Sequence, residues 1–125
     1  MAKSLITKGQ LEAALGEIIT RFEKDNSGRG PLETKTYILD DMVIFRLKGI
    51  LTRAEQKLVK DGRNAKARDL VKQMRIELIE NNRAVLEAAV KSLTKRKIKS
   101  LHVDVSTSCG EKILVLVLDK PLEFA

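Results

Sequence analysis

The sequence has little of the residues that usually build disulfides, metal sites or stacking platforms. It has one cysteine, one histidine, one tyrosine, two prolines and no tryptophan among its 125 residues. A single cysteine cannot form an internal disulfide, and one cysteine with one histidine cannot supply a structural zinc site. The composition therefore predicts a cytoplasmic protein without disulfides, bound metals or other cofactors.

Long hydrophobic runs are also missing. The longest unbroken apolar stretch, residues 113–118, has six residues, whereas a membrane-spanning helix needs about 20. The N-terminal residues lack the apolar stretch of about 7–15 residues that secretory signals carry. The length fits one domain, and 43% hydrophobic residues suffice for a core. We expect a single domain over residues 1–125 that does not insert into a membrane.

The net charge of +7 is concentrated in one part of the chain. Residues 53–99 carry fourteen Lys and Arg against six Asp and Glu, whereas residues 100–125 carry two against four. A localised positive field attracts acidic partners, although a solvated helix surface with a basic bias explains the same counts. Seven side chains are the candidates for an acidic-partner surface: Arg63, Lys66, Arg68, Lys72, Lys95, Arg96 and Lys97.

Two capping boxes indicate where helices begin. Thr7 with Gln10, and Thr52 with Glu55, have the spacing in which the first side chain accepts a hydrogen bond from the third helical N–H. The first helix should end at the turn-forming residues 25–28. The second should be short, because an Asp-Gly pair follows it closely.

A third helical pattern extends from about residue 64 to residue 94. About 30 residues at 1.5 Å each would span roughly 45 Å, more than the width of so small a domain. Residues at helical spacing form the expected seam, namely Ala67, Val71, Met74, Leu78, Val85, Ala89 and Ser92, and the stripe is widened by Leu70, Leu86, Val90 and Leu93. Either the helix breaks near Asn81-Asn82, or part of it packs on a second copy of the chain. We favour the second alternative and hence a homodimer.

The first β-hairpin is predicted around Asp40-Asp41. These two turn-tolerant residues separate two β-rich runs, and a two-residue loop places Val43 opposite Ile38. Because both faces of this hairpin carry apolar side chains, we expect both faces to be covered.

A second hairpin is predicted over residues 101–118. Its last six residues form an apolar run typical of a strand in the centre of a sheet or at an interface. The order of elements is then α-β-β-α-α-β-β. This order predicts an α+β domain with one antiparallel or mixed sheet of about four strands and one long helix.

Few residues could form a reactive site. His102 and Asp104 share a strand face, but their Cβ atoms should lie roughly 6.5–7 Å apart, too far for the direct hydrogen bonds of a triad. Gly28-Arg29-Gly30 could form a backbone concavity for an anion, but it follows a helix and lacks the Lys-Ser/Thr of a P-loop. We therefore predict no catalytic residues. The candidates for ligand contact are Gly28, Arg29, Gly30, Arg46, His102 and Asp104.

Several motifs occur together in an order typical of one bacterial family. They are Thr7-Lys8-Gly9-Gln10-Leu11-Glu12, Gly28-Arg29-Gly30-Pro31, Tyr37-Ile38-Leu39-Asp40-Asp41-Met42-Val43, Arg46-Leu47-Lys48-Gly49-Ile50-Leu51-Thr52 with Glu55, and His102-Val103-Asp104-Val105-Ser106-Thr107 with Gly110-Glu111. With these motifs, roughly residues 7–119 resemble the MpsC-like family, a small bacterial domain long catalogued as a domain of unknown function. The chain departs from the family at Val103, where Thr is often found.

The resemblance implies an accessory role. The family takes its name from a component linked to a membrane-potential-generating, sodium- or bicarbonate-associated transport system whose transporting parts are separate membrane proteins. It brings no catalytic residues with it. We therefore expect a non-enzymatic cytoplasmic accessory or interaction protein whose partner is a membrane transport protein. The alternative is a nucleic-acid-binding protein that uses the basic segment 57–99, although this segment has no aromatic residue on which single strands could stack.

Overall fold

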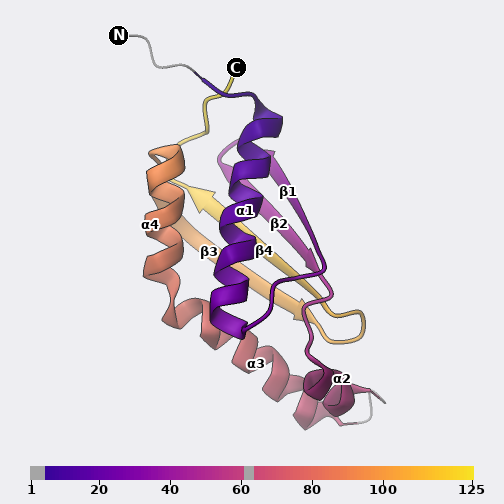
Figure 1. Cartoon of the computed structure of the whole chain (residues 1–125). Coiled ribbons are helices and arrows are strands. Elements are labelled where there is room, and N and C mark those ends of the chain that lie inside the picture. Colours follow the sequence, from indigo (N-terminus) through magenta and orange to yellow (C-terminus); the bar gives the residue numbers. More distant parts are fainter. Residues whose placement is uncertain (1–4, 61–63) are drawn as a thin grey trace.

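The computed structural model describes residues 5–60 and 64–125. In chain order its elements are α1 (Lys8–Ser27), β1 (Glu33–Leu39), β2 (Met42–Lys48), α2 (Arg53–Val59), α3 (Ala65–Asn81), α4 (Arg83–Thr94), β3 (Ile98–Ser106) and β4 (Glu111–Leu118). The strands form one antiparallel sheet in the order β1-β2-β4-β3. Figure 1 shows α1 and α4 over the same face of this sheet, with α2 and the start of α3 beyond one end of the strands. The predicted α+β class and order of elements are confirmed.

Local sequence signals set the beginnings of two helices. Both predicted capping boxes form, with the Gln10 N–H donating to Thr7 Oγ1 over 3.1 Å and the Glu55 N–H donating to Thr52 Oγ1 over 3.2 Å. Helix α1 ends at Gly28, whose φ of 80° lies in the left-handed region that glycine adopts without strain.

The hairpins also follow the sequence. Ile38 pairs with Val43 as predicted, and Asp40 takes a φ of 56° in the tight turn between the strands. Strand β4 lies between β2 and β3, so the apolar run of residues 113–118 is central in the sheet. The pairing of β2 with β4 joins the two hairpins into one sheet.

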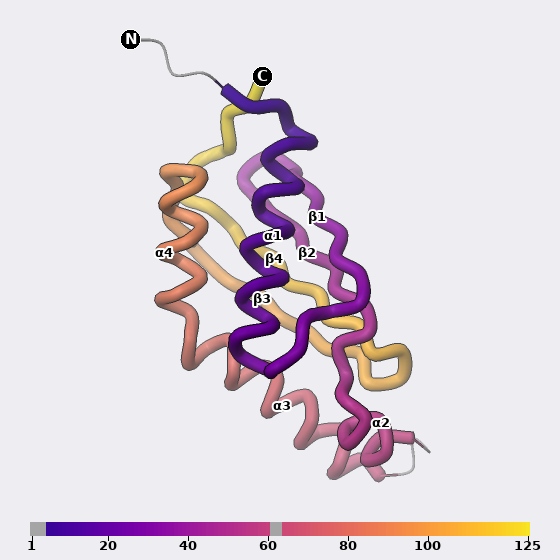
Figure 2. Tube along the Cα trace, in the orientation of Figure 1, coloured from indigo at the N-terminus to yellow at the C-terminus, as the bar shows by residue number. Residues whose placement is uncertain are grey.

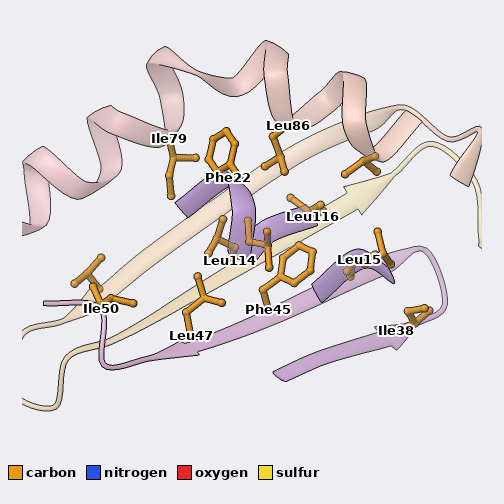
Figure 3. Packing of buried hydrophobic residues seen from close by; sticks show 14 of the residues in the cluster. Leu15, Phe22, Ile38, Phe45, Leu47, Ile50, Ile79, Leu86, Leu114 and Leu116 are labelled. Carbon is orange, nitrogen blue, oxygen red and sulfur yellow. The ribbon is translucent and has the colours of Figure 1, made fainter. Parts of the chain in front are cut away.

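The core lies between the helices and one face of the sheet. Figure 3 shows the buried side chains of the strands, among them Phe45, Leu47, Leu114 and Leu116, directed towards the helices. Leu15 and Phe22 of α1 meet them from the other side. Burying each such side chain contributes about 1.5–3 kcal/mol, so this layer holds the helices on the sheet.

The predicted long helix is interrupted. Helix α3 ends and α4 begins at Asn82, whose φ of −114° and ψ of 15° leave the helical region. The Asn82 side chain donates to the Leu78 carbonyl over 2.8 Å. Asparagine side chains compete with helix hydrogen bonds in this way, and the chain changes direction here. The first alternative, a break near residues 81–82, is therefore correct. The argument for a dimer that rested on a continuous long helix no longer applies.

The buried stripe of α3 also differs from the expected seam. Its buried members are Ala67, Val71, Arg75 and Ile79, at successive spacings of four. Met74, predicted on the seam, is 45% exposed, and Val85 of α4 is 63% exposed. The predicted stripe is therefore confirmed at Ala67 and Val71 and, among its widening residues, at Leu86 and Val90.

The two ends of the described chain lie side by side. Figure 2 shows the C-terminal residues running next to the segment that precedes α1, where the Ala125 N–H donates to the Ile6 carbonyl over 2.8 Å. Leu122 and Phe124 pack against the core. In the described residues, no helix combines the length and the apolar character that a membrane span requires.

Candidate interaction surface

One face of the sheet is covered by helices, and no described helix covers the other. Within the described residues, helices therefore cover only one face of the first hairpin, and the cover expected on its second face stays a prediction. Strand pairing places the same set of alternating residues on the open face of each strand, in rows across the sheet. The rows are Glu33, Lys48, Glu111 and Ser106; Lys35, Arg46, Ile113 and Asp104; Tyr37, Ile44, Val115 and His102; and Leu39, Met42, Val117 and Ser100. We call these sixteen residues the open sheet face.

The centre of the open sheet face is apolar. Its apolar members are Tyr37, Leu39, Met42, Ile44, Ile113, Val115 and Val117. Tyr37 is 47% exposed and Leu39 is 53% exposed, although both belong to a strand next to the covered core. The solvated face of an antiparallel sheet usually carries polar side chains. A contiguous apolar patch with a charged border instead marks a surface that binds another molecule.

The border of the open sheet face is charged at one end. Arg46 of β2 holds Glu111 of β4 through Nε and Nη2, both 3.0 Å from Oε2. Lys35 and Lys48 lie within 3.6 Å and 3.7 Å of the Glu33 carboxylate. Basic groups therefore predominate on β1 and β2, and acidic groups on β4 and β3. The charged end of the surface is therefore positive on the β1 and β2 side and negative on the β4 and β3 side.

Three of the predicted ligand-contact residues lie on this face. They do not converge on a common point. Arg46 pairs with Glu111, while the Asp104 carboxylate pairs with Lys72 of α3 over 3.3 Å. His102 contacts Ser100, with 3.2 Å between Nε2 and Oγ. They are the components of a flat border and not of a concave site.

The other three candidates have a structural role at the end of α1. Arg29 donates from Nη2 to the Gly49 carbonyl over 2.8 Å and from Nη1 to the Leu51 carbonyl over 3.3 Å. Its guanidinium thus ties the turn after α1 to the segment between β2 and α2. Gly28 ends the helix, and Gly30 passes close to Thr20. The Gly28-Arg29-Gly30 segment lies apart from the open sheet face.

The predicted acidic-partner surface is divided in space. Lys66 and Arg68 lie at the start of α3, whereas Lys95, Arg96 and Lys97 follow α4 at the opposite end of the molecule (Figure 1). Lys72 is engaged with Asp104, Arg96 donates to the Pro121 carbonyl over 3.0 Å, and Arg63 lies outside the described residues. The segment is therefore basic in sequence without forming one continuous strip.

A model of the family described as "Na+-translocating membrane potential-generating system (MpsC)" matches residues 7–120. The chain belongs to the MpsC family. It is also 40% identical over 119 residues to "Uncharacterized protein YbcI" of Bacillus subtilis (strain 168), a match that covers 94% of this chain and 92% of that protein. No solved structure matches the chain significantly.

The MpsC-family chain buries two ion pairs that sequence analysis missed. Lys112 of β4 donates to Glu23 of α1, with 2.6 Å between Nζ and Oε1. Arg75 of α3 binds both carboxylate oxygens of Glu55 in α2 and also donates to the Ile50 carbonyl over 2.8 Å. The first pair therefore joins α1 to the sheet, and the second joins α3 to α2 and to the segment between β2 and α2.

Burial and pairing shift the pKa values of two of these groups. Burial is the main influence on Lys112 and lowers its pKa, with the Glu23 carboxylate opposing the shift. Burial alone would raise the pKa of Glu55. Hydrogen bonds from Arg75 and from the Thr52 backbone, together with the Arg75 charge, bring the pKa of this carboxyl below its usual value. The Glu55 carboxylate is thus held ionised as part of the fold.

A groove between α2 and α3 also exposes apolar side chains. It has a volume of about 490 Å³ and exposes Leu58, Leu70 and Met74 above the buried Arg75–Glu55 pair.

Cys109 lies elsewhere, in the exposed loop between β3 and β4. Among residues 5–60 and 64–125, no three carboxylate, imidazole or thiol groups come together as a metal site requires.

Proposed function

We propose that this MpsC-family chain is a non-enzymatic, homodimeric accessory protein of an ion- or bicarbonate-handling membrane system and that it works in the cytoplasm. The family description supports the link to a sodium-translocating, membrane-potential-generating system. The observation that carries the interaction role is the open sheet face, whose apolar centre lies uncovered in the described part of the chain. A surface of this kind binds other proteins.

The membrane partner would dock at the basic end formed by α2 and the start of α3. Lys60 and Arg68 line a cleft of about 550 Å³ there, and Lys66 is exposed nearby. Thr107 and Ser108, which carry hydroxyl groups, line the same cleft. Cations and hydroxyl donors together suit an acidic segment of a partner, such as a carboxylate-rich loop of a transport protein.

Site-specific photo-crosslinking in cells tests this proposal. A photoreactive residue in place of Lys66 should yield a crosslink to an integral membrane subunit of a cation or bicarbonate transporter, identified by mass spectrometry. The same residue in place of Lys8, an exposed position at the start of α1, is the control and should not yield it. With the photoreactive residue still at position 66, adding Arg68→Glu should reduce the crosslink, because it reverses a neighbouring charge.

Crosslinks from position 66 to nucleic acid or only to soluble proteins would contradict the accessory role. Duplex DNA offers a second check on the nucleic-acid alternative. Phosphate contacts weaken log affinity linearly with log salt, with a slope of about −0.9 per contact. Unchanged mobility of DNA with excess protein at low salt is the result expected from the proposal.

A further inference from the structure

We infer that the open sheet face is where a second copy of this chain packs, with a two-fold axis parallel to the strands and between β2 and β4. This inference rests on the proposed role of that face as a protein-binding surface and names its occupant. Two sheets packed face to face lie about 10 Å apart with their strands nearly aligned, as in sandwich proteins.

The charges on the border select this pairing. A two-fold axis along the strands places β3 of one copy over β1 of the other. Each row of the open sheet face then lies opposite the same row of the second copy. Lys35 then faces Asp104 of the second copy, and Lys48 faces Glu111 of the second copy. In the apolar rows, Ile44 faces Val115. An axis across the strands would instead reverse the rows, so that Lys48 would face Met42 and Glu111 would face Val117 of the second copy, and the opposite-charge pairs between copies would be lost.

The size of the face suits a dimer. Four strands about 4.8 Å apart and seven residues long at about 3.3 Å per residue give a projected area of roughly 440 Å². Two such faces have a projected area of about 880 Å², and the accessible surface they bury is larger because side chains protrude from each face. A specific interface buries at least about 1,000 Å² in total. The apolar centre and the charged border also match the usual anatomy of protein interfaces.

Lys35 and Asp104 provide a test that a single copy cannot satisfy. They lie at opposite edges of the sheet in the same row, three strand spacings or about 14 Å apart. No direct contact joins them within one chain. Any compensation between charge changes at these two positions must therefore occur between copies.

The experiment measures self-association by sedimentation and native mass spectrometry. The wild-type chain should be a dimer, and Lys35→Asp or Asp104→Lys should each weaken dimerisation by about tenfold or more, because like charges then face each other twice. The double variant should restore it. Mixing the two single variants should give mainly heterodimers, because both border pairs are then of opposite charge.

Three controls separate pairing from folding. Both side chains are substantially exposed, at 46% for Lys35 and 78% for Asp104, so each variant should keep the circular dichroism spectrum of the folded wild type. Lys8→Asp makes the same change of charge away from the face and should leave the dimer intact. Lys72→Gln removes the intrachain partner of Asp104 and should also leave it intact.

The results that would overturn the inference are distinct from those that concern the membrane partner. A monomeric wild-type chain, or single variants that dimerise as tightly as the wild type, would exclude this pairing. So would a mixture of the single variants in which heterodimers are not favoured. A monomer that still forms the crosslink from position 66 would overturn the pairing and leave the accessory role standing. A dimeric wild-type chain that does not form this crosslink would leave the pairing standing and overturn the accessory role.

Discussion

Lys112, which pairs with Leu47 where β4 meets β2, forms a buried ion pair with Glu23 near the end of α1, although 89 positions separate the two residues in the sequence. Their side chains are only 2% and 4% exposed. The lysine lies on the same face of β4 as Leu114 and Leu116, among the apolar core residues. A charge in this position depends on its partner, because water cannot replace it.

Removing one member of this pair should therefore be costly. We expect Lys112→Met to lower the free energy of unfolding by about 3–5 kcal/mol, because it leaves the Glu23 carboxylate buried without a partner. Urea unfolding followed by circular dichroism measures the change. Adding Glu23→Leu should recover most of the loss, since apolar replacements of a buried pair are often neutral or stabilising. A loss below about 1 kcal/mol in the single variant would show that the pair is hydrated.

The buried Arg75–Glu55 pair allows a comparison with a partly exposed one. Glu55→Gln keeps an amide that can complete the capping box at Thr52 but leaves the Arg75 charge buried. We expect a loss of about 3–5 kcal/mol in the free energy of unfolding. Glu87→Gln breaks the partly exposed pair with Arg83 one helical turn away and should cost only about 0.3–0.5 kcal/mol. Equal losses in the two variants would contradict the structural role of the buried pair.

The lowered pKa of Glu55 predicts how stability depends on acid. The folded state releases the proton of Glu55 more readily than the unfolded state, whose pKa is near 4.5. The contribution of Glu55 to stability is therefore fully present above pH 4.5 and is lost as the pH falls through the lower pKa of the folded state. Urea unfolding between pH 7 and about pH 3 should show this decline in the wild type. Glu55→Gln should show a shallower one, and identical slopes would be evidence against the shift.

Two glycines should respond oppositely to alanine. Gly49 has a φ of 67°, and a Cβ there would lie 2.6 Å from Leu32 side-chain atoms. Gly49→Ala should therefore lower the free energy of unfolding by about 1–3 kcal/mol. Gly9 lies in the first turn of α1 with open space around it. Gly9→Ala should raise stability by about 0.5–1 kcal/mol, because alanine loses less backbone entropy in a helix. Chemical denaturation of both variants measures the difference.

Much of the fold could be predicted because its signals are local. The capping boxes at Thr7 and Thr52 and the turn at Asp40 each involve residues within three positions of one another. Hydrogen bonds over such short separations form in nearly any context, so residue identity is enough to locate them. The break at Asn82 was an alternative that sequence analysis raised but did not choose. Its decisive contact, from the side chain to the Leu78 carbonyl, competes with an ordinary helical bond of similar energy.

The candidate site was predicted only in part. Arg46, His102 and Asp104 do share one surface, because alternation along a strand places them there. Arg29 was expected to contact a ligand, and it binds backbone carbonyls near Gly49 instead. That contact joins segments 20 residues apart, and no pattern in the sequence marks it. The open sheet face itself was not predicted. Apolar residues on both faces of a hairpin indicate that both faces are covered, but they do not show which face the helices of the same chain cover.

By itself, the sequence determined the order of the elements, the beginnings of two helices and the register of the first hairpin, since periodicity and short-range hydrogen bonds carry that information. Only the tertiary structure decided which faces are covered and which charges are buried. Arg75 follows Val71 by one helical turn, and Lys112 precedes Leu114 by two positions, so both positions lie on core-facing stripes. Whether a charge can remain there depends on a carboxylate arriving from a distant segment, and long-range packing alone places Glu55 and Glu23 within reach.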